Sequence, residues 1–281
     1  MAYSSVALSQ GADSLMAWAD AQGGRVVSLA EVDSTSDYLR AYWPTFQRDG
    51  AAWAVCLADR QTAGRGRQGH AWLSAPGAGL WCSLAVPVVP RVDMAGDATP
   101  PLSLVLAAAL IDVLRDAGFP VMLKWPNDLW LSERKVGGLL IEQLGVSRAR
   151  YWLAGIGINW QAPAALPPDK TGGSVEAAGL FDALPAMGVL PNDSTGLRAE
   201  LTDRLCRRAL ETIRAPDCWS DWMCRADTYS VLSGRRVQVW QDGSPQSSGF
   251  AERIEPDGTL MINTDAGATR VGGSASVRLL I

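Results

Sequence analysis

Four apolar segments follow one another between residues 121 and 158, and only short turns separate them. They read VMLKWP, DLWL, KVGGLLIEQL and YWLAGIGI. Short apolar runs that are rich in branched and aromatic residues and bounded by Gly, Pro, Asn or Asp are typical of strands. The earlier segments RVVSLAEV, AWAVCLAD and GLWCSLAVP, at 25–32, 52–59 and 79–87, have the same character. The chain is therefore expected to fold around a sheet.

Helical signals lie between and after these strands. Apolar spacing and capping residues predict four helices. One covers 9–21, one begins at a capping residue among 33–35 in DSTS, one runs from 99–101 to Gly118, and one covers 197–213. The segment WSDWMCRADTY is expected to continue the last of these helices beyond Pro216.

The character of the sequence changes after about residue 232. RRVQVW, SGFAERI, GTLMIN, ATRV and SVRLLI are short strand-like segments, and the turns DGSP, PDG and DAG separate them. This pattern predicts a small β-barrel of about 50 residues, a size that usually needs a neighbour for stability. We therefore expect one domain at 1–231 and a second at 232–281.

Composition excludes several classes of protein. The 281 residues are 48% hydrophobic and 19% charged, as in a folded soluble chain. A net charge of -4 argues against a general nucleic-acid binder, which would be basic. The start MAYSSVALSQGADSL is too polar for a signal peptide, and the apolar run LSLVLAAALIDVL, interrupted by Asp112, is too short to span a membrane. These features predict a cytoplasmic protein.

Five cysteines and one histidine, with no CxxC pair, make a zinc site improbable and favour a reduced, metal-free interior.

The segment GRGRQGHAW, at 64–72, has the densest local basic character. Its glycines allow backbone N–H groups to turn toward one point, and its arginines add charged donors that match phosphate or carboxylate. The segment therefore predicts a loop that closes over a small anion. A solvated basic turn and a nucleic-acid contact remain alternatives.

The segment KWPNDLW places Lys124, Asn127 and Asp128 around a proline turn. One interpretation is an ordinary hairpin turn. The other is a set of polar groups at the rim of a sheet, where Asp128 would help to hold Mg²⁺ beside substrate phosphates.

Lys135 begins an apolar strand in KVGGLLIE, and Gly137 and Gly138 follow it. A lone lysine at such a position usually extends along the sheet edge to water. The two glycines remove side chains from the strand and would admit a ligand, beside which the lysine would neutralise a carboxylate and a phosphate. His70 lacks the GxSxG context of a serine hydrolase, and no Walker or kinase signature is present.

Taken in order, DSTS, QTAGRGRQGHAW, KWPNDL, KVGGLLIE, GIGIN and the small β-domain resemble the biotin–protein ligases. The resemblance runs from about Val26 to the C-terminus. It implies an α/β (α+β) fold, with a catalytic domain of the biotin/lipoyl-ligase type built on a mixed sheet, followed by an SH3-like barrel. It also implies a two-step reaction. ATP and biotin, with Mg²⁺, give biotinyl-5′-AMP and pyrophosphate, and a lysine of a biotin carboxyl carrier protein then takes the biotin.

The resemblance also assigns roles. Lys135, Arg65 and Arg67 are the implied catalytic residues, because two anions must be brought together. The implied biotin contacts are Ser34, Thr35, Ser36, Gln61, Arg65, Gly66, Arg67, Lys135 and Gly138. The implied contacts to ATP or the adenylate are Gly64, His70, Trp72, Lys124, Asn127, Asn159 and Arg278, with Asp128 as a magnesium ligand.

Three residues depart from the family pattern. Ser36 stands where the family usually has Asn, His70 where Arg is common, and Ser274 where Glu usually follows the glycine pair. A histidine in the loop would make its positive charge depend on pH near neutrality.

Other functions remain open. A lipoate or octanoate ligase or transferase of the same fold would need a longer apolar tunnel, and a non-catalytic biotin sensor would not need Lys135 and both arginines. About twenty-five residues precede the first strand, which leaves little room for a DNA-reading head, so no DNA binding is expected. A homodimer is possible on the family pattern.

Overall fold

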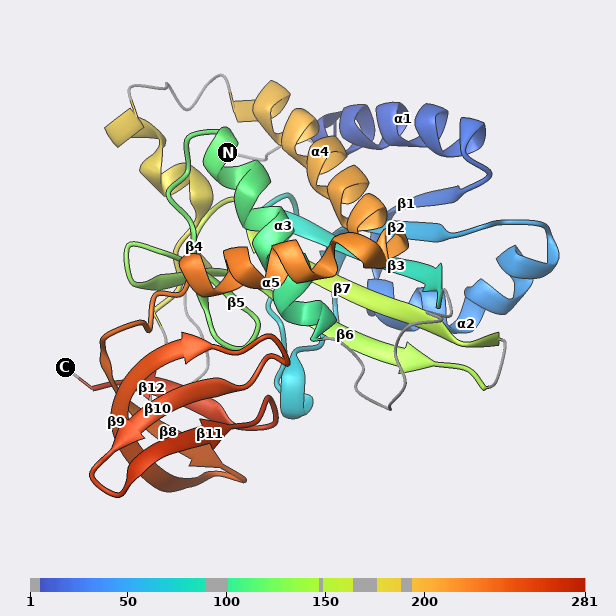
Figure 1. The fold of residues 1–281 in the computed structure, drawn as a ribbon. Helices are drawn as coiled ribbons and strands as arrows, with labels where there is room; N and C mark the ends of the chain where they lie inside the picture. Colours follow the sequence, from blue (N-terminus) through green and yellow to red (C-terminus); the bar gives the residue numbers. More distant parts are fainter. Residues whose placement is uncertain (1–5, 89–100, 147–148, 164–175, 188–193, 281) are drawn as a thin grey trace.

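A computed structural model describes residues 6–88, 101–146, 149–163, 176–187 and 194–280. Its elements form a large mixed sheet with helices on both faces and a smaller sheet at the C-terminal end (Figure 1). The mixed α/β architecture predicted from the sequence is confirmed. No helix within these described ranges is long and apolar enough to cross a lipid bilayer.

The large sheet has the strand order β1-β2-β3-β7-β6-β5-β4. Only β1 and β2 run parallel, and every other neighbouring pair is antiparallel. The strands are β1 Arg25–Val32, β2 Ala54–Gln61, β3 Gly79–Pro87, β4 Met122–Lys124, β5 Asp128–Leu131, β6 Arg134–Leu144 and β7 Tyr151–Asn159. All the strand segments expected before residue 160 are present.

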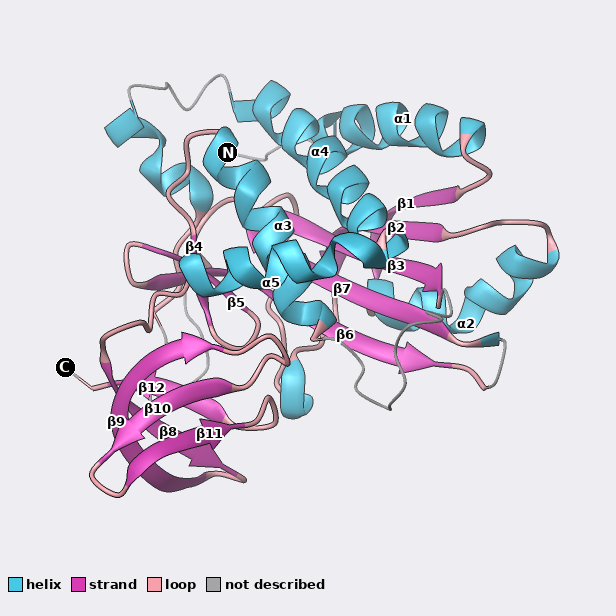
Figure 2. Cartoon of the chain, in the orientation of Figure 1, coloured by secondary structure: helices cyan, strands magenta, loops and turns pink. Residues whose placement is uncertain are grey.

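Helices cover the large sheet on both of its faces (Figure 2), and alternate residues of the strands pack toward one face or the other. Val55 and Leu57 of β2 belong to the main core, whereas Ala54 and Cys56 belong to a second cluster that helix α2 covers. This alternation follows from the two-residue repeat of a strand. The main core is covered by α1 Val6–Ala21, α3 Leu102–Asp116, α4 Ser194–Arg214 and α5 Trp219–Thr228, and the other face by α2 Thr35–Arg48.

Two helix predictions are refined. Helix α3 begins after Pro101, and the rest of its predicted start lies outside the described residues. The segment WSDWMCRADTY forms a separate helix, α5, so the prediction that it continues α4 is wrong. Pro216 explains the break, because a proline disfavours the helical conformation in the residue before it, and Ala215 has φ -114° and ψ 68°. The described residues also contain the 3-10 segments η1 Arg67–Gly69, η3 Leu180–Met187 and η5 Pro216–Cys218.

The C-terminal strands form a five-stranded antiparallel sheet with the order β11-β10-β9-β8-β12. They are β8 Arg236–Gln241, β9 Ser244–Ile254, β10 Leu260–Thr264, β11 Gly267–Val271 and β12 Ser276–Leu279. The five strands predicted are confirmed, but the closed SH3-like barrel is not. Within the described residues β11 and β12 are the two edges of this sheet and do not pair with each other. β12 is only four residues long, so it has few backbone groups with which to pair with another strand.

The two sheets are joined by specific contacts. The indole of Trp125 donates a hydrogen bond to the carbonyl of Gly258 at 2.9 Å. Asp227 accepts one from the backbone N–H of Ile254 at 2.7 Å. Buried side chains such as Val237 and Ile262 belong to the same apolar cluster as the helices of the large sheet. The small sheet is therefore held against the large one by both apolar packing and hydrogen bonds.

Candidate active site

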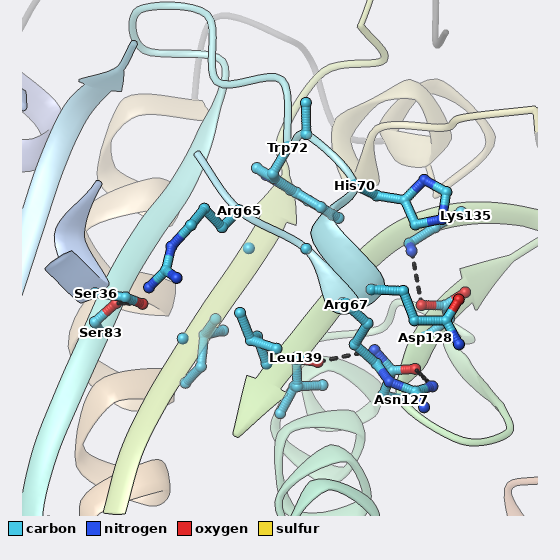
Figure 3. A pocket seen from close by; sticks show the side chains of 18 of the residues that line it. Ser36, Arg65, Arg67, His70, Trp72, Ser83, Asn127, Asp128, Lys135 and Leu139 are labelled. Atoms are coloured by element: carbon cyan, nitrogen blue, oxygen red, sulfur yellow. Dashed lines mark hydrogen bonds and ion pairs between the residues drawn. The ribbon is translucent and has the colours of Figure 1, made fainter. Parts of the chain in front are cut away.

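A cavity opens on the α2 face of the large sheet, beyond the part that α2 covers (Figure 3). Its floor comes from β3, β7 and β6, and the segment 64–72 lies over it. The side chains and backbone that line it include Ser34, Thr35, Ser36, Gln61, Arg65, Gly66, Arg67, Gln68, His70, Trp72, Ser83, Lys124, Asn127, Asp128, Lys135, Gly138, Leu140, Gly155, Gly157 and Ser276.

Small residues in register make the floor. Gly155 of β7 pairs with Ser83 of β3, and Gly157 pairs with Gly138 of β6. A Cβ at Gly157 would lie 2.6 Å from an indole carbon of Trp72, and one at Gly155 would lie 3.0 Å from the Ser36 hydroxyl. The bare backbone therefore gives room for these side chains and for a flat ligand above the sheet.

The polar end of the cavity is built at the N-terminus of α2. Ser34 is the N-cap of this helix, and its hydroxyl accepts a hydrogen bond from the N–H of Asp37 at 3.3 Å. Thr35 donates to the side-chain oxygen of Gln61 through both its backbone N–H and its hydroxyl, at 2.9 and 3.1 Å. Ser83 lies 2.8 Å from the hydroxyls of both Thr35 and Ser36.

The segment 64–72 is closed by its own backbone. The N–H of Gly66 donates to the carbonyl of His70 at 2.7 Å, and the N–H of Trp72 donates to the carbonyl of Gly64 at 2.8 Å. Gln68 at its tip has φ 53°, in the left-handed region. These bonds form a narrow loop whose side chains project over the cavity.

Arg65 is held by two carboxylates. Its guanidinium lies 2.8 Å from Asp37 and 3.7 Å from Glu142. Arg40 also pairs with both of these carboxylates. Two cations and two anions thus form one network at the side of the cavity nearest α2, and this network aims Arg65 toward Ser36 (Figure 3).

Arg67 points in the opposite direction, toward the small sheet. It donates to the side-chain oxygen of Asn127 at 2.9 Å and to the carbonyl of Gly273. Asn127 in turn donates to the carbonyl of Leu139 at 2.8 Å. Gln68 donates to the carbonyl of Ser274 at 3.0 Å, so the loop contacts the segment between β11 and β12. Burial lowers the pKa of Arg67, and Asp128 opposes that shift.

Lys135 and Asp128 form an ion pair of 2.7 Å between Nζ and Oδ1, shown dashed in Figure 3. Burial alone would raise the pKa of Asp128, but Lys135 and Lys124 together lower it below its usual range. Burial lowers the pKa of Lys124, as do Lys135, Arg278 and Arg67, against the opposing effect of Asp128. The site therefore carries more positive charge than its one central carboxylate neutralises, which is the electrostatics of an anion-binding site.

Trp72 lies between the loop and the floor. The Lys135 ammonium is 5.3 Å from the centre of the Trp72 ring. The Trp72 and Trp81 rings meet at 70°, with 6.2 Å between their centres. A cation over an indole face is an attractive contact, so Trp72 helps to position the ammonium of Lys135.

Most of the residues predicted for the site line this cavity, but three do not. Gly64 closes the base of the loop, where a Cβ would lie 2.7 Å from the carbonyl oxygen of Trp72. Asn159 donates to the carbonyl of Ala178 at 3.2 Å and lines a neighbouring cavity beside Trp81. Arg278 stacks over Trp240 with its guanidinium carbon 4.5 Å from the ring centre.

Sequence reasoning missed Ser83, Gln68 and Ser276, which line the cavity. Ser83 had a signal, because it is the one hydroxyl in the apolar strand segment GLWCSLAVP. Gln68 and Ser276 had none, since their positions depend on how the small sheet meets the loop.

The donor set around Asp128 does not suit a resident metal ion. The described residues contain no group of three or more His, Cys, Asp or Glu side chains placed to hold one. Asp128 already pairs with an ammonium and lies among cations, whereas Mg²⁺ prefers several oxygen ligands.

Comparisons with known proteins agree with this architecture. The model of the biotin/lipoate A/B protein ligase family matches residues 29–159. The biotin–[acetyl-CoA-carboxylase] ligase of Paracoccus denitrificans is 31% identical over 251 residues, 85% of this chain and 94% of that protein. The bifunctional ligase/repressor of Escherichia coli is 39% identical over 139 residues, 49% of this chain, and that match spans 41% of its length.

Among solved structures, the biotin protein ligase from Aquifex aeolicus, in complex with biotin and ATP, has a similar fold. The TM-score is 0.69 at 24% identity, with 91% of this chain and 99% of that chain covered. The match to the Paracoccus ligase carries the assignment, because it combines 31% identity with coverage of most of both chains. The chain belongs to the biotin–protein ligase family.

Proposed function

We propose that this protein is an ATP-dependent biotin–protein ligase. It would join biotin to AMP, release pyrophosphate, and pass the biotin to a lysine of a carrier protein. The observation that carries the proposal is the cavity itself. One end of it offers hydroxyl and amide groups beside Arg65, which two carboxylates already pair, and the other end offers Arg67, Lys124 and Lys135 around one carboxylate.

The two ends match the two chemical halves of biotinyl-5′-AMP. A urea ring needs hydrogen-bond donors and acceptors in a dry pocket, which Ser34, Thr35 and Gln61 would supply. A carboxylate that approaches the α-phosphate of ATP needs fixed positive charge, because both groups are anions. Lys135 and Arg67 lie where that charge is needed if the urea ring occupies the α2 end.

The first step would form one bond and break one. A carboxylate oxygen of biotin attacks the α-phosphorus, and the bond from that phosphorus to the bridging oxygen breaks, so that pyrophosphate leaves. Lys135 would neutralise the charge shared by the carboxylate and the α-phosphate, and its contact with Asp128 would hold it in place.

The second step would transfer the acyl group. A neutral lysine amine of the carrier attacks the carbonyl carbon, AMP leaves with the bonding electrons, and the amine loses one proton. The loop at 64–72 would keep water from the mixed anhydride until the carrier arrives. Arg65 and Arg67 anchor that loop at opposite sides, one to α2 and one to the small sheet.

The remaining features of the proposal follow from the same site. Magnesium would arrive with the nucleotide, because the residues around Asp128 do not suit a resident ion, and no step is assigned to it. Gly66 and Gly138 would contact biotin. The residues that would contact the adenylate or shape its pocket are Gly64, His70, Trp72, Lys124, Asn127, Asn159 and Arg278. The carrier would be a biotin carboxyl carrier domain, the small sheet would serve as the SH3-like domain of the family, and the protein would act in the cytoplasm, alone or as a homodimer.

One assay tests the proposal against its alternatives. Exchange of labelled pyrophosphate into ATP is measured with biotin, lipoate or octanoate as the acid. Exchange that depends on biotin supports the proposed ligase. Exchange with lipoate or octanoate, and none with biotin, would show that the substrate is one of those acids instead. Binding of biotin without exchange would indicate a sensor. A carrier domain and its acceptor Lys→Arg variant then test the transfer step.

A further inference from the structure

A row of hydrogen bonds links four side chains at the α2 end of the cavity. Gln61 contacts Thr35, Thr35 contacts Ser83 at 2.8 Å, and Ser83 contacts Ser36 at 2.8 Å. Thr35, Ser36 and Ser83 are 3%, 7% and 0% exposed, so bulk water does not compete with these bonds. Figure 3 shows Ser36 and Ser83 together at this end, beside Arg65.

The direction of the row is fixed at Gln61. The backbone N–H of Thr35 lies 2.9 Å from the Gln61 side chain, and a backbone N–H can only donate. The atom that faces it is therefore the amide oxygen. The amide nitrogen then faces Ser74, to which it donates at 3.0 Å.

That direction passes from one hydroxyl to the next. The Thr35 hydroxyl lies 3.1 Å from the same Gln61 oxygen, and two oxygens at that distance need a proton between them, so Thr35 donates. Thr35 has no second proton, so Ser83 donates to Thr35. Ser83 has then used its proton, so Ser36 donates to Ser83.

Ser36 ends the row with its proton committed and its remaining lone pair available to the cavity. Ser34 has the opposite polarity. Its oxygen accepts from the N–H of Asp37, and within the described part of the chain its own proton has no protein acceptor. The α2 end of the cavity thus presents an acceptor at Ser36 and a donor at Ser34.

We propose that Ser83 is a positioning residue that sets this polarity and thereby selects a ligand head with both an N–H donor and a carbonyl acceptor. The inference rests on the proposed function, in which that head is the urea ring of biotin. A dithiolane ring or a methyl end supplies neither group, and it would leave the remaining lone pair of Ser36 and the hydroxyl proton of Ser34 without partners, which is unfavourable. Ser83 would therefore act in discrimination between acids, through Ser36 and Thr35.

Binding to the full chain is measured by calorimetry with three acids: biotin, desthiobiotin and lipoate. Desthiobiotin keeps the urea but lacks the sulfur ring, so it isolates the N–H and carbonyl contacts. The variants are Ser83→Ala, Ser36→Ala and the double variant. Ser230→Ala is the matched control, because Ser230 is a buried serine that follows α5, pairs with Leu123 and makes no hydrogen bond to these groups.

Ser83→Ala should weaken biotin and desthiobiotin by the same factor, about 10-fold to 100-fold, and leave lipoate binding unchanged or stronger. Because Ser83 acts through Ser36, the double variant should lose little more than the larger single loss. In the exchange assay the KM for biotin should rise, while kcat at saturating biotin and the KM for ATP change by less than about twofold. Ser230→Ala should match the unaltered protein.

The outcomes separate the two proposals. If the unaltered chain does not bind biotin, the proposed function fails and this inference fails with it. If it binds biotin and Ser83→Ala binds biotin equally well, only the inference fails. Equal losses for lipoate and biotin would also overturn it, because they would indicate general damage to the pocket. Should Ser83→Ala fail to fold, Ser36→Ala alone must still show the loss for both urea ligands and not for lipoate.

Discussion

The ammonium of Lys135 lies 2.7 Å from the carboxylate of Asp128, across the antiparallel pair of strands β6 and β5. The backbone of Lys135 is also bound on its other side, where its N–H donates to the carbonyl of Glu176 at 2.9 Å and its carbonyl accepts from Ala178 at 2.9 Å. The lysine is thus fixed at both its backbone and its charged end, as a group that stabilises developing charge must be.

Lys135→Ala should lower biotin-dependent pyrophosphate exchange by about 100-fold to 1,000-fold, the usual cost of losing one fixed group that stabilises a transition state. Lys135→Gln, which keeps the length but not the charge, should lose a similar amount. Arg253→Ala serves as the control, because Arg253 is an exposed cation on β9 that pairs with Glu255 far from the cavity. Full exchange in both Lys135 variants would remove the role assigned to this residue.

Lys124→Met should stabilise the unliganded protein while it weakens adenylate formation. Burial and the neighbouring cations lower the pKa of Lys124, so the folded state disfavours its charged form. A lysine whose pKa is lowered on folding destabilises the native state at neutral pH, and that cost disappears as the pH rises through the folded pKa toward 10.5, the ordinary value. At pH 7 the thermal midpoint should rise by about 2–4 °C for each 1 kcal/mol recovered.

The pH dependence provides the check on Lys124. The difference in thermal midpoint between Lys124→Met and the unaltered chain should be largest near pH 7 and should shrink as the pH approaches 10. A variant that is less stable at pH 7, or a difference that does not vary with pH, would contradict the assignment. Methionine is chosen because it fills a similar volume beside Trp130, whose ring centre is 5.2 Å from the lysine nitrogen.

The strands and helices could be predicted from the sequence because local patterns determine them. The β3 segment GLWCSLAVP is strand from Gly79 to Pro87, as its apolar character indicates. Capping also acts locally, and Ser34 begins α2 for that reason. Closure of the C-terminal strands could not be predicted, since it depends on whether two edge strands meet rather than on either strand alone.

The site shows the same division. The resemblance to the family implies Lys135 and the two arginines, and all three line the cavity. Ser83 has a sequence signal as the one hydroxyl of its strand segment, but its role depends on cross-strand register and on the hydroxyls that α2 brings to it, which local patterns do not determine. Asn127 is a related case. Its side chain bridges Arg67 and the carbonyl of Leu139, so it orients the arginine rather than projecting alone into the cavity.

Limited trypsin digestion should detect the loop at 64–72. Arg65 and Arg67 are its two trypsin sites, and their anchors are ion pairs and hydrogen bonds at a partly exposed surface. Such contacts stabilise a segment weakly, so the free protein should open there and be cut. Biotin with ATP should slow this cleavage by about 10-fold or more, because ligands that bind only the closed loop lower the open population.

Cleavage elsewhere on the same protein is the internal control for the loop. The exposed Arg253 on β9 should be cut at the same rate with and without ligands. Equal protection at both places would indicate stabilisation of the whole fold, and no protection at 65 and 67 would count against a loop that closes on the ligand.

Gly157→Ala should disturb Trp72 more than it disturbs the fold. The new Cβ would lie 2.6 Å from an indole carbon and 2.9 Å from the indole nitrogen, closer than any real contact allows, so the ring must move. The expected cost is about 1–3 kcal/mol of unfolding free energy. Because Trp72 also contacts the ammonium of Lys135, the displaced ring should raise the KM for ATP and biotin together.

Gly196→Ala is the matched control, since a Cβ at Gly196 in α4 meets nothing within 4 Å and should be neutral or slightly stabilising. Tryptophan fluorescence, thermal midpoint and exchange kinetics are measured on both variants. Unchanged KM values in Gly157→Ala would mean that the position of Trp72 over the glycine floor does not matter for substrate binding.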